Sequence, residues 1–295
     1  MLGLSDAGWG ALCAVASAIT WAVIGLLVRA LPSFNSVTVK AARSTVGGAL
    51  ILGWVLATGG LSGLTAMSAK AFGLLSISVL LAVGLGDTVF FESTRWLGLA
   101  RAMTVSMTYP LIAELLAALF LGEALTLRLA VGSLVTLGGL VLTVAARQDG
   151  ASERARFWPG IGAATLASCA WAASVIVLKP SLVEVDAIRA QAIRLPVAAA
   201  LLWATPWAWR AATPLSRHGA AALWRLLALG ALTAVSSIVF VAAVHYAGVA
   251  VATVLSSTAP MFAIPLGLVF LGERLAWMAV VGTIVTIVGI AVLQL

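Results

Sequence analysis

The sequence has 295 residues, of which 62% are hydrophobic and only 9% charged, and its formal net charge is +7. A soluble domain carries far more charge on its surface, so this composition indicates an integral membrane protein. The 17 Lys and Arg residues are thinly spread and form no basic stripe, which argues against a nucleic-acid-binding protein.

Ten apolar runs follow one another along the chain, and each is long enough to cross a bilayer as a helix. Backbone groups in lipid must be hydrogen-bonded within their own segment, so we expect helices throughout. No positively charged stretch precedes the first run, which therefore predicts a transmembrane helix rather than a cleaved signal peptide. The predicted helices are residues 8–29, 35–57, 70–95, 99–121, 126–146, 158–178, 187–209, 222–247, 250–271 and 275–294.

The most polar connection, residues 148–157, divides these helices into five and five, which predicts a first repeat at 1–147 and a second at 158–295. A gapless shift of 150 residues aligns Pro110 with Pro260, and the same shift aligns Trp21 with Trp171. Because five is odd, the second half must enter the membrane from the opposite side. The predicted fold class is thus an all-α integral membrane protein with ten transmembrane helices in two inverted five-helix repeats.

The motif Phe-Leu-Gly-Glu, which recurs at 120–123 and 270–273 after each aligned proline, carries a family resemblance. With it, the chain resembles the drug/metabolite transporter superfamily and, within it, the EamA type of ten-helix carriers. The resemblance implies a central cavity lined mainly by the third, fourth, eighth and ninth helices, and export of amino acids, drugs, nucleotide sugars or other metabolites. Glu123 and Glu273 are expected to cap the helices that follow them.

Charged residues inside the predicted helices are candidates for function because a charge is costly in the bilayer. Glu114 is the deepest acid, and it is either a structural partner of an arginine or a cavity acid that binds a substrate amine or a proton. Asp87 is a second candidate, with Ser237 at the equivalent position of the second repeat. Glu92 and Arg95, three residues apart, predict a local ion pair.

Arg43 and Arg194 occupy nearly equivalent positions in the two repeats. Their guanidinium groups suit an anionic substrate group, or they pair with Asp87 and Glu114. His245 is either a group that takes up a proton near neutral pH or an ordinary interface residue.

Pro110 and Pro260 interrupt the fourth and ninth helices at matching positions, which indicates a binding cavity nearby. Hydroxyl groups precede both prolines and either face this cavity or bond their own backbone. The predicted substrate-binding residues are Glu114, Asp87, Arg43, Arg194, Ser106, Tyr109, Ser256, Ser257, Trp21 and Trp171. The proton-coupling candidates are Glu114, Asp87 and His245. Five glycines of the fifth and tenth helices predict close scaffold packing: Gly132, Gly138, Gly139, Gly282 and Gly289.

These features predict a secondary transporter, an exporter or exchanger, that moves amino acids or similar small metabolites by alternating access in the inner (plasma) membrane. The alternatives are a multidrug or lipid-linked substrate flippase, or a non-transporting subunit of a membrane complex. No G-x-x-x-x-G-K-[ST] sequence occurs, so an ion gradient, exchange or facilitated diffusion is expected to drive transport.

Enzymatic activity is not expected, because His218 and His245 have no neighbouring acid motif. Cys13 and Cys169 lie in apolar runs, and we expect no metal site and no cofactor. The expected partners are a small-molecule substrate and membrane lipids, and the protein is expected to be a monomer.

Loop charges and the family resemblance predict opposite membrane orientations. Most cations, with Lys40 counted among them, fall in the odd-numbered connections, so the positive-inside rule places both termini outside. The resemblance implies that both termini lie inside.

Overall fold

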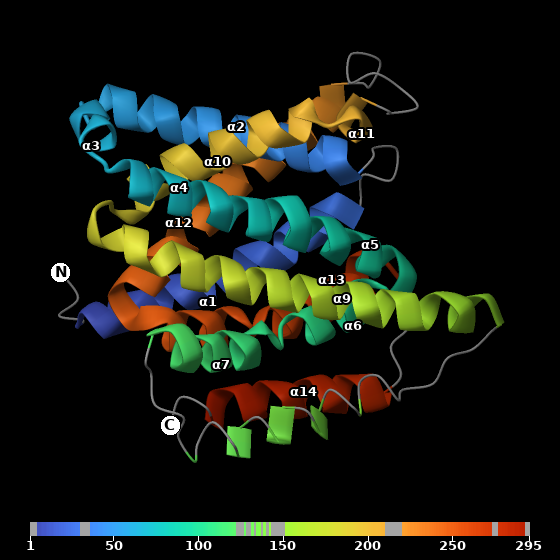
Figure 1. Cartoon of the computed structure of the whole chain (residues 1–295). Helices are drawn as coiled ribbons and strands as arrows, with labels where there is room; N and C mark the ends of the chain where they lie inside the picture. The colour runs from blue at the N-terminus through green and yellow to red at the C-terminus, as the bar shows by residue number, and fades with distance from the viewer. Residues whose placement is uncertain are drawn as a thin grey trace.

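The computed structural model describes residues 5–29, 36–121, 151–209, 220–272 and 277–292, together with positions 127, 131, 132, 134–136, 138, 139 and 142. Within these residues the regular structure is entirely helical. Figure 1 shows the helices running alongside one another in a bundle, in which elements of the two halves of the chain alternate. The predicted caps at Glu123 and Glu273 lie outside the described residues.

The first half of the chain contains two helical spans that are each assembled from several segments. Segments α4, η1 and α5 form the third span, and α6 with α7 forms the fourth. The elements are α1 (Asp6–Arg29), α2 (Ser36–Ala57), α3 (Leu61–Thr65), α4 (Ala69–Val79), the π-helical η1 (Leu80–Gly86), α5 (Asp87–Leu97), α6 (Leu99–Ser106) and α7 (Tyr109–Leu121).

The second half of the chain begins its first helix earlier than predicted. Helix α9 starts at Ala151, so residues 151–157 form its first turns instead of a loop. The stretch contains Glu, Arg and Ala, which favour helix, and no Gly or Pro, so polarity alone does not mark a break. The elements are α9 (Ala151–Leu178), the 3₁₀-helical η2 (Lys179–Val183), α10 (Ala187–Ala204), α11 (Pro206–Trp209), α12 (Ala220–Ser256), α13 (Ala259–Phe270) and α14 (Trp277–Val292).

Among the described residues, 7 helices are long and apolar enough to cross a membrane. One of them, Ala222–Phe270, has 49 residues, about twice the length that a span needs, and Gly248 divides it in two. Helix α14 adds a shorter apolar helix, and the helix predicted at 126–146 lies largely outside the described residues. The described residues thus have the predicted all-α membrane architecture.

Two glycines at equivalent positions join the third helix to the fourth in each repeat. Gly98 and Gly248 share a φ of 81°, with ψ of 164° and 173°. Only glycine adopts this backbone conformation without strain. One residue thus redirects the chain where a loop would otherwise be needed.

The prolines start new helical segments, as their positions predicted. Helix α6 ends at Ser106 and α7 begins at Tyr109, while α12 ends at Ser256 and α13 begins at Ala259. At these breaks Thr108 and Thr258 donate to the carbonyl oxygens of Val105 and Leu255, at 2.8 and 2.7 Å. These hydroxyls satisfy backbone carbonyls that the interrupted helices leave open.

Contacts between the repeats occur in exchanged pairs, in which the same contact is made twice with the roles of the two repeats interchanged. This is expected for pseudo-two-fold symmetry. Ser106 donates to the carbonyl oxygen of Ala164 at 3.1 Å, and its equivalent Ser256 donates to that of Ala14, the equivalent of Ala164, at 3.3 Å. Helix α1 packs along α12, and α9 packs along α5 in the same relation. The fourth helix of each repeat is thereby bonded to the first helix of the other.

The glycine-rich helices also cross in an exchanged pair. A Cβ on Gly139 would lie 2.6 Å from the carbonyl oxygen of Gly282, and one on Gly289 would lie 2.8 Å from Cα of Thr136. Figure 1 places the described residues between 127 and 142 beside α14, away from the centre of the bundle. Two backbones therefore approach closely there, which only glycine permits.

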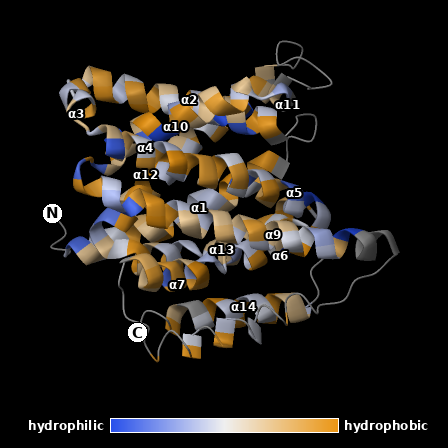
Figure 2. Ribbon diagram, in the orientation of Figure 1, coloured by the Kyte–Doolittle hydropathy of each residue, from blue (hydrophilic) through white to orange (hydrophobic). Residues whose placement is uncertain are grey.

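The outside of the bundle is apolar along the helices. Figure 2 shows hydrophobic residues along most helix lengths and hydrophilic stretches mainly near the ends of the bundle. Phe120, Phe270 and Trp277 are 73%, 68% and 77% exposed. Large apolar side chains with this exposure suit contact with lipid.

Candidate functional site

A cavity of about 160 Å³ lies inside the bundle and takes its walls from both repeats. The first repeat contributes residues of α1, α2, α4, η1, α5 and α7, and the second contributes residues of α9, α10 and α12. The lining residues are Ser17, Trp21, Ile24, Arg43, Val79, Ala82, Val83, Asp87, Met107, Tyr109, Trp171, Ser174, Val175, Gln191, Arg194, Leu195, Thr233, Ser236, Ser237, Phe240 and Ser256.

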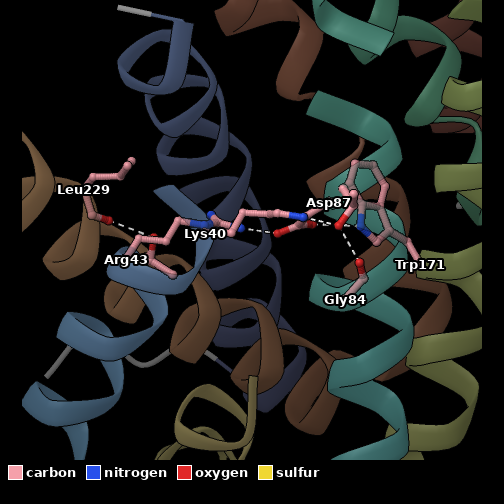
Figure 3. A network of polar contacts seen from close by, with 8 residues as sticks. Lys40, Arg43, Gly84, Asp87, Trp171 and Leu229 are labelled. Atoms are coloured by element: carbon pink, nitrogen blue, oxygen red, sulfur yellow. Dashed lines mark hydrogen bonds and ion pairs between the residues drawn. The ribbon is translucent and has the colours of Figure 1, made fainter. Parts of the chain in front are cut away.

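A buried ion pair joins α2 to α5 at the cavity wall. Nη2 of Arg43 bonds Oδ2 of Asp87, and the two side chains are only 2% and 6% exposed. The indole Nε1 of Trp171, from α9, donates to the other carboxylate oxygen of Asp87 at 3.1 Å. Figure 3 shows how Asp87 receives Arg43 from one side and Trp171 from the other. The carboxylate thus connects the two repeats.

Local backbone structure positions Asp87 for these contacts. The π-helical segment Leu80–Gly86 ends directly before it, and π-helical turns are frequent at functional sites. A Cβ on Gly86 would lie 2.6 Å from Nε1 of Trp171. The missing side chain at Gly86 therefore lets the indole reach the carboxylate.

A lysine lies beside this ion pair in the same polar network. Lys40 is fully buried on α2, and its Nζ donates to Oγ1 of Thr88, which in turn donates to the carbonyl oxygen of Gly84 (Figure 3). The prediction that Lys40 lies in a connection was wrong, because α2 begins at Ser36 and contains Lys40. One cation fewer therefore supports the placement of both termini outside by the positive-inside rule.

The second arginine of the cavity, Arg194 on α10, forms no ion pair with an acid of the described residues. It is 6% exposed, and its Nη2 makes a long hydrogen bond of 3.5 Å to Oγ of Ser174. Its Nε finds no acceptor among the described residues, and neither do Nε and Nη1 of Arg43. A buried donor without a partner is costly, so these groups indicate a polar ligand.

Aromatic rings form the wall beside the charges. Trp21 and Trp171 meet edge to face with ring centroids 5.7 Å apart, and Tyr109 contacts Trp171 in the same manner at 6.1 Å. The guanidinium carbon of Arg43 lies 5.7 Å from the Trp21 ring and 5.4 Å from the Phe91 ring. These rings stabilise the buried cation and give the cavity an apolar face.

The cavity includes most of the predicted binding residues. It brings together Arg43, Asp87, Arg194, Tyr109, Ser256, Trp21 and Trp171. The lining does not include four predicted site residues: the binding residues Ser106, Ser257 and Glu114, and the proton-coupling candidate His245.

At least three of those four make other contacts, and Ser106 is the residue that bonds Ala164. Ser257 donates to the carbonyl oxygen of Thr253 at 2.7 Å, the local bonding that was the alternative for these hydroxyls. His245 lies exposed against the ring of Tyr246, with centroids 4.9 Å apart. The predicted local pair of Arg95 with Glu92 is present at 3.1 Å.

Several lining residues escaped the sequence analysis because they are neutral. Gln191 lies three positions before Arg194, and Ser17 lies four before Trp21. Helical spacing places each on the same face as its predicted neighbour. Counting three or four positions along the helix from each predicted residue would have identified these neutral residues from the sequence.

Buried charges in a cavity between two inverted helical repeats define a membrane carrier by architecture. The EamA-like transporter family matches residues 8–145 and 158–295. The chain belongs to this family and is a multi-pass membrane transporter, not an enzyme.

One solved structure, described only as the crystal structure of a protein, is similar to this chain with a TM-score of 0.72. The match covers 96% of this chain and 95% of the other at 20% identity, so it concerns the fold alone. No curated protein matches the chain.

Proposed function

We propose that the protein is a secondary carrier that moves amino acids or similar small metabolites across the inner (plasma) membrane by alternating access. The observation that carries this proposal is the cavity between the repeats, with Arg43, Asp87 and Arg194 buried in its wall. Intramembrane charges that face a shared cavity are characteristic of substrate and ion pathways.

The size of the cavity favours a small solute. Its volume is about 160 Å³. An apolar cavity of roughly 150 Å³ holds a benzene-sized molecule, whereas pockets for drug-sized ligands measure about 300–1,000 Å³. An amino acid suits this volume better than a multi-ring drug or a lipid-linked sugar.

The exchanged contacts between the repeats support alternating access. Ser106 with Ala164, and Ser256 with Ala14, are the same contact made twice. In an inverted repeat, rocking one half against the other interchanges the environments of equivalent positions. Such pairs form equivalent interfaces on either side of one central cavity, as this mechanism requires.

Asp87 is our choice for proton coupling, because it is the only one of the three candidates that lines the cavity. Protonation of this carboxylate weakens its bond to Arg43 and changes the charge that the substrate meets. An Asp87→Asn variant is expected to lose the dependence of transport on a pH gradient, whereas Glu114→Gln is expected to keep it.

Reconstitution into liposomes tests the function. Labelled amino acids and small metabolites are expected to move faster into protein-containing vesicles than into empty ones, and Arg194→Gln is expected to slow them. Arg225→Gln, the same substitution at an exposed position of α12, is the matched control. Equal flux in protein-containing and empty vesicles across the panel, with and without a pH gradient, would refute the proposal.

A further inference from the structure

The two repeats exchange equivalent contacts, and this rule predicts where a contact is missing. Ser106 bonds Ala164 while Ser256 bonds Ala14. The equivalent of Trp171, which donates to Asp87 of the other repeat, is Trp21. The pseudo-symmetry therefore predicts an acceptor in the second repeat for the N–H group at Nε1 of Trp21.

The position that should provide this acceptor carries a serine. Ser237 is the equivalent of Asp87, and it lines the same cavity. Its hydroxyl donates to the carbonyl oxygen of Ala234 at 3.0 Å instead of accepting from the tryptophan. Nε1 of Trp21 is buried and has no acceptor in the part of the chain that the structure describes.

The same substitution leaves an arginine without its acid. In the first repeat Arg43 forms an ion pair with Asp87, whereas among the described residues its near-equivalent Arg194 makes the long hydrogen bond to Ser174 and interacts with Asp87 only through space. Nε of Arg194 is an unused donor, and the side chain is more than nine-tenths buried. An arginine and a tryptophan therefore both lack the oxygen atoms that Asp87 supplies to their counterparts.

The donors without partners that line the cavity are all N–H groups. They are Nε1 of Trp21, Nε and Nη1 of Arg43, and Nε of Arg194. With two arginines and one aspartate, the named charges of the lining also leave an excess positive charge. A ligand that satisfies this wall must bring acceptor oxygens and negative charge.

We propose that the carboxylate of the transported solute binds between Arg194 and Nε1 of Trp21, as the second-repeat counterpart of the Asp87 carboxylate. This inference rests on the proposed function and names its substrate class: small solutes with a free carboxylate. With the solute bound, each arginine has one carboxylate and each indole one acceptor. The carboxylate of the solute thus takes the place of the side-chain carboxylate that the second repeat lacks at Ser237.

The inference predicts that an aspartate at position 237 replaces the solute's carboxylate. Ser237→Asp is expected to abolish carboxylate binding and to leave the ligand-free protein at least as heat-stable as the wild type. Ser237→Asn, of nearly the same size but uncharged, is the matched control and is expected to keep carboxylate binding.

Thermal unfolding of the purified full-length protein in detergent provides the test. The probes are two pairs that differ only in the acid group: L-valine with L-valinamide, and benzoate with benzamide. For the wild type, each acid is expected to raise the unfolding midpoint with an apparent Kd at least about tenfold below that of its amide, as loss of a charged hydrogen bond implies.

Two further variants keep the test decisive if Ser237→Asp fails to fold. Arg194→Gln is expected to weaken binding of both acids about tenfold, while the exposed Arg225→Gln leaves it unchanged. Trp21→Phe keeps an aromatic ring, removes the one donor, and is expected to weaken acid binding severalfold.

Three results would overturn the subsite: an amide that binds as tightly as its acid, an Arg194→Gln variant that binds acids like Arg225→Gln, or a wild type that neither acid stabilises. A Ser237→Asp variant that binds acids like Ser237→Asn would do the same. None of these results decides whether the protein is a carrier, because the vesicle assay tests transport separately. Conversely, selective acid binding without flux would support the subsite and count against transport.

Discussion

The two repeats meet in two different ways, at the crossing of α14 and at the central cavity. At the crossing, Gly139 and Gly289 make the same close approach in each direction. At the cavity, Asp87 has its contacts but its equivalent Ser237 does not repeat them. Duplicated contacts hold the repeats together, and the unduplicated position is where we propose that the solute binds.

The largest expected effect comes from breaking the unduplicated ion pair. Asp87→Ala leaves Arg43 charged and buried, and removing one partner of a buried pair costs about 3–5 kcal/mol. The control is Glu92→Ala, which breaks the half-exposed pair with Arg95 and is expected to cost about 1 kcal/mol or less. Unfolding midpoints in detergent measure both, and equal losses would contradict a buried, structurally important pair.

The duplicated crossing is tested by two adjacent glycines. A Cβ on Gly139 collides with backbone of α14, whereas a Cβ on Gly138 meets nothing within 4 Å. Gly139→Ala is expected to lower the free energy of unfolding by about 3 kcal/mol, the upper end of overpacking costs, and Gly138→Ala is expected to change it little. The same detergent unfolding assay compares the pair, and a tolerated Gly139→Ala would mean that the helices do not approach so closely.

The tryptophans compare a satisfied position directly with an unsatisfied one. Trp171→Phe removes the donor to Asp87 and is expected to cost about 2 kcal/mol of stability, as for a hydrogen bond to a charged group. Trp21→Phe removes a donor that has no acceptor among the described residues, so its cost to the ligand-free protein is expected to be smaller. Unfolding midpoints of both variants are measured without and with L-valine. Without the ligand, Trp171→Phe is expected to lower the midpoint more, whereas Trp21→Phe is expected to weaken L-valine binding more.

The smallest effect is expected at a surface contact between the repeats. The carboxylate of Glu184 accepts the backbone N–H and the hydroxyl of Ser68, at 3.0 and 2.9 Å. These bonds hold the pKa of Glu184 below its ordinary value. The contact therefore contributes fully above the ordinary pKa of a glutamate, and the contribution is lost as pH falls through the lowered pKa.

Glu184→Gln tests this pH dependence. The variant is expected to differ slightly from the wild type at neutral pH, with the difference disappearing in acid. Unfolding midpoints across this pH range measure it, and a difference that grows in acid would contradict the assigned sign.

The sequence was sufficient for the architecture because its signals are local or repeated. Span length and the prolines at 110 and 260 act through the backbone at their own positions. The start of α9 was misplaced because polar residues mark the end of a membrane run without ending a helix. Hydropathy therefore predicts the membrane-crossing segment more accurately than it predicts the ends of the helix that contains this segment.

Only the tertiary structure decided which polar residues meet. Helical spacing places Asp87, Glu114 and Arg43 on faces of their own helices, but the rotation and offset between helices select the partners. Packing brings Arg43 to Asp87, places Lys40 inside and leaves Glu114 out of the cavity lining. The sequence alone shows that Asp87 is matched by Ser237. That this mismatch leaves Arg194 and Trp21 with unused donors follows from the packing of helices of both repeats around one cavity.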